Sequence, residues 1–372
     1  MAEKFSLKDH LFNATTVAQL AHEYASGVPG FDPARFQKEA LAGFPERELM
    51  ARLDWLADCA EAQLSSVFPD MADQLEAAMP APLDPGLKDD DFGQFIHAVP
   101  GILAVRHGLE EHRERAMALL YRATQRFSME FYIRPFLNRW RAETLADLSV
   151  WAEDDNYHVR RLVSEGTRPK LPWAKAVTLT PEHTLPLLDR LHGDPTRYVT
   201  RSVANHLNDL TKQHPDLVLD TLDGWQGQAA QQAKELDWMT RHALRTLIKQ
   251  GHAGAMTALG FDADAPVTVD LEIATPKIKI GDTLTFTCVI EAPADLPVLV
   301  DYRIGFARPD GKSGEKVFKL KQGQVRPGKP LTLKKAHKLK GDATTFKLYP
   351  GAHALTVQVN GVDRATGSFE LV

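Results

Sequence analysis

The sequence lacks cysteine pairs, long apolar runs and the motifs of several common enzyme classes. Its 372 residues include only two cysteines, Cys59 and Cys288, which excludes a disulfide framework and a cysteine-rich zinc or iron–sulfur site. No stretch of about 18 apolar residues is present that would span a membrane. HExxH, GxSxG, P-loop and GxGxxG motifs are absent as well, which argues against the enzymes that depend on them. The first ten residues, MAEKFSLKDH, lack the apolar core of a signal peptide, so we expect a cytoplasmic protein.

Charge is distributed unevenly along the chain. The net charge is -5, but residues 1–100 carry 7 basic and 17 acidic side chains, whereas residues 308–347 carry 12 basic and 3 acidic ones. The acidic total argues against a simple nucleic-acid coat protein. It is compatible with a protein that has a basic binding face and an acidic back.

The first 260 residues have the apolar spacing of helices. In residues 45–65, for example, Leu49, Leu53 and Leu56 recur at intervals of three and four, which is typical of an amphipathic helix. The same spacing predicts further helices over 109–126, 142–152, 182–192 and 198–213. We therefore expect residues 1–260 to form a helical domain.

Beyond residue 261 apolar and polar residues alternate, and turn residues separate the alternating segments. This pattern predicts strands over 267–273, 283–291, 298–306, 316–322, 331–339, 354–360 and 367–372. Six or seven short strands in about 105 residues are typical of an immunoglobulin-like β-sandwich. The predicted fold is therefore a multidomain α + β protein, with a β-sandwich over residues 261–372.

The helical part contains a repeat of 40 residues. Val159, Val199 and Met239 are each followed two residues later by an arginine, and short loops with Asp154 and Asp194 precede the first two copies. A helix–turn–helix unit of this length is typical of HEAT-like repeats, which stack into a curved solenoid with a concave groove. Two interpretations of the basic residues stay open: they bridge neighbouring repeats, or they contact DNA phosphates. The residues concerned are Arg160, Arg161, Arg201, Lys212, Arg241, Arg245 and Lys249.

Three segments resemble a known family. WAEDDNYHVRRLVSEGTRPKLPW and DPTRYVTRSVANHLNDLTKQHPD resemble the HEAT-like-repeat DNA glycosylases, and LYPGAHALTVQVNG resembles the immunoglobulin-like domain of their AlkC branch. The resemblance implies excision of N3-alkylated bases, 3-methyladenine and 3-methylcytosine, from duplex DNA. It implies no base flipping, in contrast to most glycosylases, and no metal or organic cofactor. We expect a bacterial cytoplasmic monomer that associates with the nucleoid when it binds DNA, and no membrane partner.

Carboxylates and an aromatic ring suffice for this chemistry. An N3-alkylated adenine is cationic and leaves readily, and the deoxyribose gains oxocarbenium character as the bond breaks. A carboxylate beside the sugar stabilises that charge and positions water, as in glycoside hydrolysis. An aromatic face adds a cation–π attraction.

Four residues are candidates for this chemistry. Glu165 lies at a position that is polar in all three repeats, and Trp173 follows in a proline-flanked loop. Glu130 lies among aromatic residues, where partial desolvation strengthens its attraction to a cation. The family resemblance also favours acidic residues at positions 130 and 165. Asp209, one turn past the Glu165 counterpart in the next repeat, is a weaker candidate.

Structural interpretations of the same residues stay open. Glu165 would be a solvated helix residue, Glu130 would pair with Arg134 four residues later, and Trp173 would pack between repeats.

Lysines alternate with apolar residues in the basic stretch of the β domain. A period of two places such lysines on one face of a sheet, where they would grip DNA phosphates and close a clamp. Protection of an exposed sheet edge is the alternative. The lysines concerned are Lys312, Lys316, Lys319, Lys321 and Lys334.

Two other functions compete with the glycosylase. One is a non-enzymatic HEAT-like scaffold, which would display apolar anchors in its groove. The other is a protein that binds damaged DNA without cutting it. The expected groove positions are Arg, Asn, Glu and Lys, which favours DNA over a protein partner.

Overall fold

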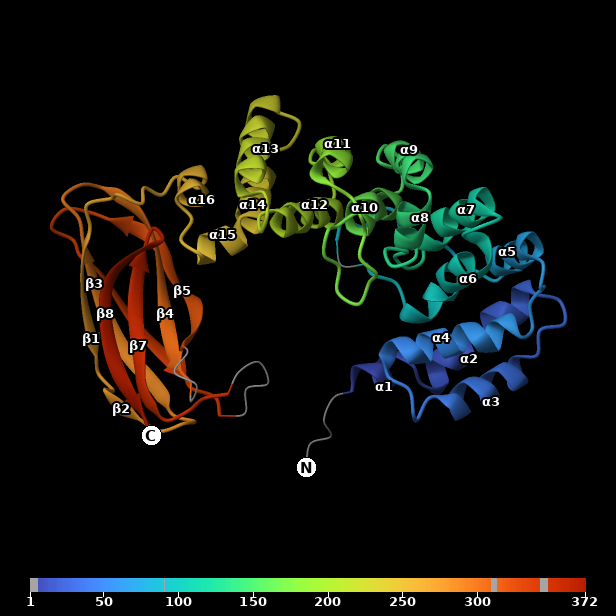
Figure 1. The fold of residues 1–372 in the computed structure, drawn as a ribbon, viewed down its shortest axis with the longest axis horizontal. Coiled ribbons are helices and arrows are strands. Elements are labelled where there is room, and N and C mark those ends of the chain that lie inside the picture. The colour runs from blue at the N-terminus through green and yellow to red at the C-terminus, as the bar shows by residue number, and fades with distance from the viewer. Residues whose placement is uncertain (1–5, 90, 309–312, 342–346) are drawn as a thin grey trace. The chain divides into compact units, whose positions relative to one another are not determined.

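The structure, a computed structural model, describes residues 6–89, 91–308, 313–341 and 347–372 (Figure 1). The chain divides into two compact units. The first comprises the chain to Leu210 together with Trp225–His242, and the second comprises Thr211–Gly224 together with Ala243–Val372. The division of the sequence at residue 260 stays a prediction. No helix in the described part of the chain is long and apolar enough to cross a membrane.

Helices form nearly all of the regular structure before residue 260. Asn13 and Asp32 cap α2 and α3 by accepting backbone N–H donors of the first turn, as N-cap residues do. Each predicted helix is confirmed within a few residues. The elements are α1 (Leu7–Leu11), α2 (Ala14–Gly27), α3 (Pro33–Gly43), α4 (Leu49–Glu61), α5 (Phe68–Ala77), η1 (Phe95–Ala98), α6 (Val99–Gly108), α7 (Arg113–Thr124), α8 (Ile133–Arg139), α9 (Arg141–Trp151), α10 (Tyr157–Gly166), α11 (Pro181–Leu191), α12 (Arg197–Leu210), α13 (Pro215–Gln228), α14 (Ala233–Ala243), α15 (Arg245–Lys249) and α16 (Ala253–Ala258).

The 40-residue repeat appears in the contacts between α10, α12 and α14. Ser202 Oγ on α12 donates to Glu165 Oε2 on α10 at 2.6 Å. Forty residues later, His242 Nε2 on α14 lies 2.9 Å from Asn205 Oδ1 on α12. The same inter-repeat hydrogen bond therefore recurs, with Glu165 replaced by a neutral amide in the next copy.

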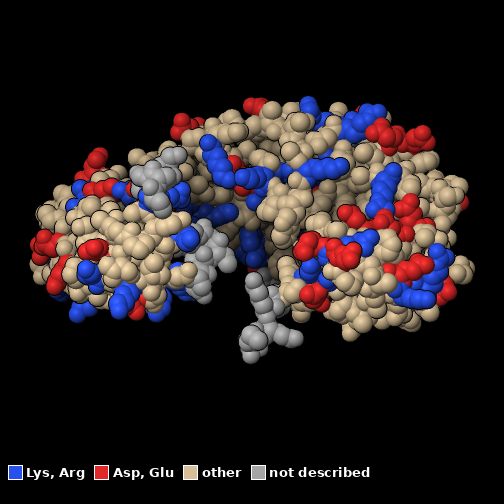
Figure 2. Space-filling model, turned by 60° about the horizontal axis from the view of Figure 1, so that its bottom comes forward, with Lys and Arg blue, Asp and Glu red and all other residues tan. Residues whose placement is uncertain are grey.

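Acidic side chains of the first 100 residues pair with arginines of α6 and α7. Arg106 contacts Asp58 at 2.7 Å and Glu61 at 2.9 Å. Arg115 contacts Asp73 and Glu76 in the same way. Figure 2 shows acidic and basic side chains interleaved on the N-terminal helices, at the right of the view. Ion pairing thus offsets part of the acidic excess that the sequence shows in this region.

Two sheets enclose the core of the C-terminal β-sandwich. One sheet has the order β1-β3-β6 and the other β2-β8-β7-β4-β5. Phe286, Tyr302 and Val357, which come from both sheets, are fully buried between them. All seven predicted strands are confirmed, and the short β2 was not predicted. The strands are β1 (Thr268–Ile273), β2 (Lys277–Ile278), β3 (Thr283–Glu291), β4 (Leu296–Ala307), β5 (Ser313–Val325), β6 (Leu331–Lys338), β7 (Gly351–Val359) and β8 (Val362–Leu371).

The segment before the sandwich packs on strand β4. Met256 and Phe261 form a small apolar cluster with Leu299, which lies on the opposite face of β4 from the main core. Two residues along the strand, Asp301 is buried in register with Lys319. Burial raises the pKa of Asp301 to about 6, although Lys319 and Lys249 attract its ionised form.

This buried carboxyl predicts a pH-dependent stability. Because the native pKa of Asp301 lies above its unfolded value near 4, the free energy of unfolding falls as the pH rises from about 4 to about 6. We expect Asp301→Asn to raise the free energy of unfolding by about 1–2 kcal/mol at pH 8 and by about half as much at pH 5. Urea unfolding followed by circular dichroism measures both values. A variant that is less stable than the wild type at pH 8 would contradict this account.

Candidate functional site

A cavity of about 360 Å³ lies within the first unit. Its walls come from the α7–α8 loop, α10, the loop after α10, the start of α12, the segment before η1 and the first residue of η1. Three of the four predicted catalytic residues, Glu130, Glu165 and Trp173, meet at this cavity. The full lining is Phe92, Phe95, Phe127, Ser128, Glu130, Phe131, Arg161, Glu165, Arg168, Leu171, Pro172, Trp173 and Tyr198.

Arg161 joins the two glutamates. Its Nη1 donates to Glu130 Oε2, and its Nη2 lies 3.5 Å from Glu165 Oε2. Ser128 Oγ donates to the same Glu130 oxygen at 2.7 Å. The guanidinium also lies over the Tyr198 ring, 4.8 Å from its centroid. One arginine on α10 therefore fixes two carboxylates that are 35 residues apart in sequence.

Glu165 is buried and held in its ionised form. Glu165 is only 4% exposed. Arg168 Nη1 and Ser202 Oγ each donate to its carboxylate at 2.6 Å. Burial raises the pKa of this carboxyl, but Arg161, Arg168 and the Ser202 hydroxyl together lower it further, so the net shift is downward. Interpreting Glu165 as a solvated helix residue is wrong, and a general-acid role is excluded at neutral pH.

Glu130 has a different hydrogen-bond arrangement. The donors described for it, Ser128 and Arg161, both reach Oε2. Among the residues that the structure describes, none donates to Oε1 of Glu130. Glu130 lies at the cavity wall, and its Oε1 accepts no hydrogen bond from the described residues. This oxygen is therefore suited to contact a cation or a water molecule.

Arg134 holds the loop that follows α10. It is 1% exposed, and it donates to the backbone oxygens of Gly166 at 3.0 Å, Arg168 at 2.8 Å and Lys175 at 2.5 Å. The predicted alternative pairing of Arg134 with Glu130 is therefore wrong. Since the loop carries Trp173, Arg134 determines where that ring emerges.

Trp173 projects from the loop. It is 68% exposed, so the interpretation that it packs between repeats is wrong. Its backbone has a φ of 62°, a left-handed conformation that is uncommon for a bulky residue. An exposed aromatic ring on a strained backbone next to two carboxylates points to a binding role.

Asp209 lies one ion pair away from the cavity. Its carboxylate contacts Arg168 at 2.9 Å, and Arg168 in turn contacts Glu165. Asp209 is not among the residues that line the cavity. Its position fits support of Arg168 better than contact with a substrate.

The predicted DNA-binding arginines of the first unit are paired with carboxylates. Arg160 on α10 contacts Asp194 of the next repeat at 2.5 Å, which is the repeat-bridging role that the sequence left open. Arg201 pairs with Asp89, and Arg241 with Asp237. In the second unit, Lys212 and Lys249 are exposed and Arg245 is half-buried. Contact of these residues with DNA stays a prediction.

The predicted lysines of the β domain do not share one face. Cross-strand neighbours lie on the same face of a sheet, and Lys316 pairs with the core residue Ile304, whereas Lys319 pairs with Asp301 on the opposite face. Lys334 belongs to the other sheet. The expected single lysine face is therefore wrong. Lys321 is exposed, and Lys312 lies outside the described residues.

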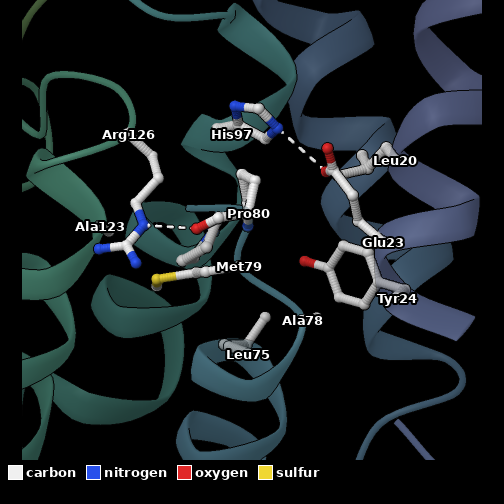
Figure 3. A pocket seen from close by; sticks show the side chains of 11 residues that line it. Leu20, Glu23, Tyr24, Leu75, Ala78, Met79, Pro80, His97, Ala123 and Arg126 are labelled. Atoms are coloured by element: carbon white, nitrogen blue, oxygen red, sulfur yellow. Dashed lines mark hydrogen bonds and ion pairs between the residues drawn. The ribbon is translucent and has the colours of Figure 1, made fainter. Parts of the chain in front are cut away.

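A second cavity, among the N-terminal helices, does not fit a nucleobase. Its volume of about 20 Å³ is sufficient for about one water molecule. His97 Nε2 lies 3.0 Å from Glu23 Oε2, and Arg126 donates to the Pro80 carbonyl (Figure 3). These two contacts join neighbouring segments of the N-terminal part.

Sequence reasoning missed several residues of the site. Ser202 was detectable in principle, because the 40-residue register aligns it with His242 and thus with the inter-repeat hydrogen bond. Ser128, Arg168 and Phe92 had no periodic signal, since they lie in or next to loops whose course the repeat does not determine.

Comparisons with known proteins agree with this architecture. Residues 267–372 match the model of a family described as the C-terminal Ig-like domain of an uncharacterised protein, YhaZ. The full-length "Uncharacterized protein YhaZ" of Bacillus subtilis is 33% identical over 97% of this chain and 98% of its own length. The solved structure of the Pseudomonas fluorescens alkylpurine DNA glycosylase AlkC, bound to DNA with an abasic-site analog, is 34% identical. The match covers 99% of this chain and 100% of the AlkC chain, with a TM-score of 0.88. The chain thus belongs to the AlkC family of DNA glycosylases, with a HEAT-like-repeat solenoid and a C-terminal immunoglobulin-like domain.

Proposed function

We propose that this protein is a monofunctional DNA N-glycosylase that excises N3-alkylated bases, 3-methyladenine and 3-methylcytosine, from duplex DNA without flipping the base. The observation that supports this most directly is the pair of glutamates held by Arg161 beside an exposed Trp173. The partner is double-stranded DNA, and the active species is a monomer. Neither a metal nor an organic cofactor has a role in the proposed reaction.

The two carboxylates would act on the sugar. As the bond to the cationic base breaks, positive charge moves onto the deoxyribose, and a preformed carboxylate stabilises it with little reorganisation. Glu130 is suited to this role because its Oε1 accepts no hydrogen bond from the described residues. Glu165 keeps Arg161 in place and adds a second negative charge.

Glu130 would also position the attacking water. Water adds to the sugar carbon as the neutral 3-methyladenine leaves, and the carboxylate accepts the proton that the water loses. The products are the free base and an abasic strand. Trp173 would cover the lesion, which excludes bulk water and adds cation–π attraction.

A base-release assay tests this proposal. Duplex DNA treated with a methylating agent is incubated with the full chain, and free 3-methyladenine and 3-methylcytosine are measured by mass spectrometry. Release with an abasic strand that breaks only on alkali treatment supports a monofunctional glycosylase. Tight binding without release would indicate a damaged-DNA-binding protein, and neither binding nor release would indicate a scaffold.

We also propose that the β domain grips the DNA backbone. Lys319 and Lys321 are exposed on β5, and each phosphate contact contributes about 0.9 to the slope of log affinity against log salt. We expect Lys319→Ala together with Lys321→Ala to lower that slope by about 1–2 and to weaken DNA binding. Lys277→Ala, an exposed lysine on β2, is the matched control. An unchanged slope in the double variant would remove these lysines from the DNA interface.

A further inference from the structure

A strap formed by residues 83–89 and 91–93 connects α5 to η1 and lies against α12. The backbone N–H of Leu83 donates to the Gln125 carbonyl at 2.9 Å, and the backbone N–H of Tyr198 donates to the Lys88 carbonyl at 3.1 Å. Asp89 pairs with Arg201, one turn further along α12. Three contacts therefore fix the course of a segment that has no regular secondary structure.

The strap places Phe92 at the cavity. Phe92 lines the cavity and is nevertheless 50% exposed. Its ring meets the Tyr198 ring edge to face, with centroids 5.4 Å apart, and Tyr198 is the ring over which Arg161 lies. The turn at Gly93 requires glycine. Its φ is 67°, and the Cβ of any other residue would lie 1.9 Å from the Arg126 carbonyl oxygen. Phe92 is thus held at the wall of the cavity that contains the two glutamates.

Two exposed aromatic rings from separate loops border one cavity. Phe92 and Trp173 are both among the exposed large apolar side chains, and leaving such a ring in water forgoes the stabilisation that burial would give. The N3 edge of an adenine that stays in the duplex faces the minor groove, so its alkyl group, and not its ring face, would meet these side chains. An apolar alkyl group would therefore cover surface that is exposed in the free protein.

We propose that Phe92 is a specificity-determining residue, which limits the size of the alkyl group that the site accepts. The proposal rests on the proposed glycosylase function. The Asp89–Arg201 ion pair and the Lys88 carbonyl are positioning contacts, because they fix the strap that carries Phe92. In this arrangement Arg201 orders the active-site wall and is not a phosphate contact.

The alternative is that the strap competes with DNA. In this account a DNA phosphate would replace the Asp89 carboxylate at Arg201. It would also replace the Lys88 carbonyl at the backbone N–H of Tyr198, in the first turn of α12. The two accounts differ for Asp89→Asn. Competition predicts tighter DNA binding with unchanged base selectivity, whereas positioning predicts altered selectivity.

The experiment compares release of a methylated and a benzylated adenine from duplex DNA under single-turnover conditions. We expect Phe92→Ala to lower release of 3-methyladenine about fourfold, because the methyl group loses its apolar contact, and to raise the benzyl-to-methyl ratio. Asp89→Asn should raise that ratio in the same direction. Leu87→Ala is the matched control, because Leu87 lies on the same strap with 44% exposure but does not line the cavity.

Each outcome decides between the accounts. A ratio in Phe92→Ala equal to that of the wild type and of Leu87→Ala would overturn the specificity role. Asp89→Asn with tighter DNA binding and an unchanged ratio would establish competition in its place. Phe92→Leu, which keeps an apolar side chain, guards against misfolding, and thermal unfolding is measured for every variant. A wild type that releases no base refutes the proposed function itself, which is a distinguishable result.

Discussion

Glu130→Gln is expected to lower the single-turnover rate of 3-methyladenine release by about a hundredfold to a thousandfold. Glutamine keeps the shape of the side chain and removes the charge that would face the sugar. It also leaves Arg161 less compensated, because that guanidinium contacts both Glu130 and Glu165. An uncompensated cation next to a developing oxocarbenium ion raises the barrier further.

Glu235→Gln is the matched control for this variant. Glu235 also accepts hydrogen bonds from an arginine, Arg197, and from the Thr200 hydroxyl. Burial raises the pKa of Glu235, but Arg197 and Thr200 lower it further, so the net shift is downward, as for Glu165. Glu235 does not line the cavity. We expect Glu235→Gln to be less stable than the wild type but to keep most of its base release, in contrast to Glu130→Gln. Equal rates for Glu130→Gln and the wild type would remove Glu130 from the reaction.

The repeat could be predicted because core residues carry its period. Val159, Val199 and Met239 are all fully buried, so a single apolar frame recurs every 40 residues. The strands could be predicted for a similar reason, since alternating burial runs through β3 from Leu284 to Ile290. The two-residue β2 escaped because it is too short to show any alternation.

The candidate site could be predicted only in part. The repeat register identified Glu165 as a polar position, aromatic neighbours pointed to Glu130, and a proline-flanked loop pointed to Trp173. The resemblance to the glycosylases then favoured acids at positions 130 and 165. The sequence leaves open whether Arg161 bridges repeats or contacts phosphate, and the structure places it between the two glutamates. Pairings such as Arg201 with Asp89 join residues more than 100 positions apart, and no periodic pattern in a single sequence encodes them.

Arg134→Met is the second variant with a large expected effect. The substitution leaves the carbonyls of Gly166, Arg168 and Lys175 without their donor, at a cost of about 1–3 kcal/mol for each carbonyl that water does not reach. Burial lowers the pKa of Arg134 to about 10, so the native side chain is a desolvated cation at neutral pH. Removing that charge offsets part of the loss. We therefore expect a net destabilisation of about 2–3 kcal/mol.

Activity should fall more than stability. The three carbonyls belong to the segment that carries Arg168 and Trp173, so the variant frees both residues even in molecules that stay folded. All six tryptophans precede residue 239 and lie in the first unit, so urea unfolding followed by tryptophan fluorescence measures its stability. Trypsin cleavage after Lys170 or Lys175 measures loop release. Arg139→Met on the same helix, whose ion pair with Glu110 is exposed, should change neither quantity by much. A folded Arg134→Met protein with full base release would show that the position of Trp173 does not govern the reaction, because the tether would then be structural only.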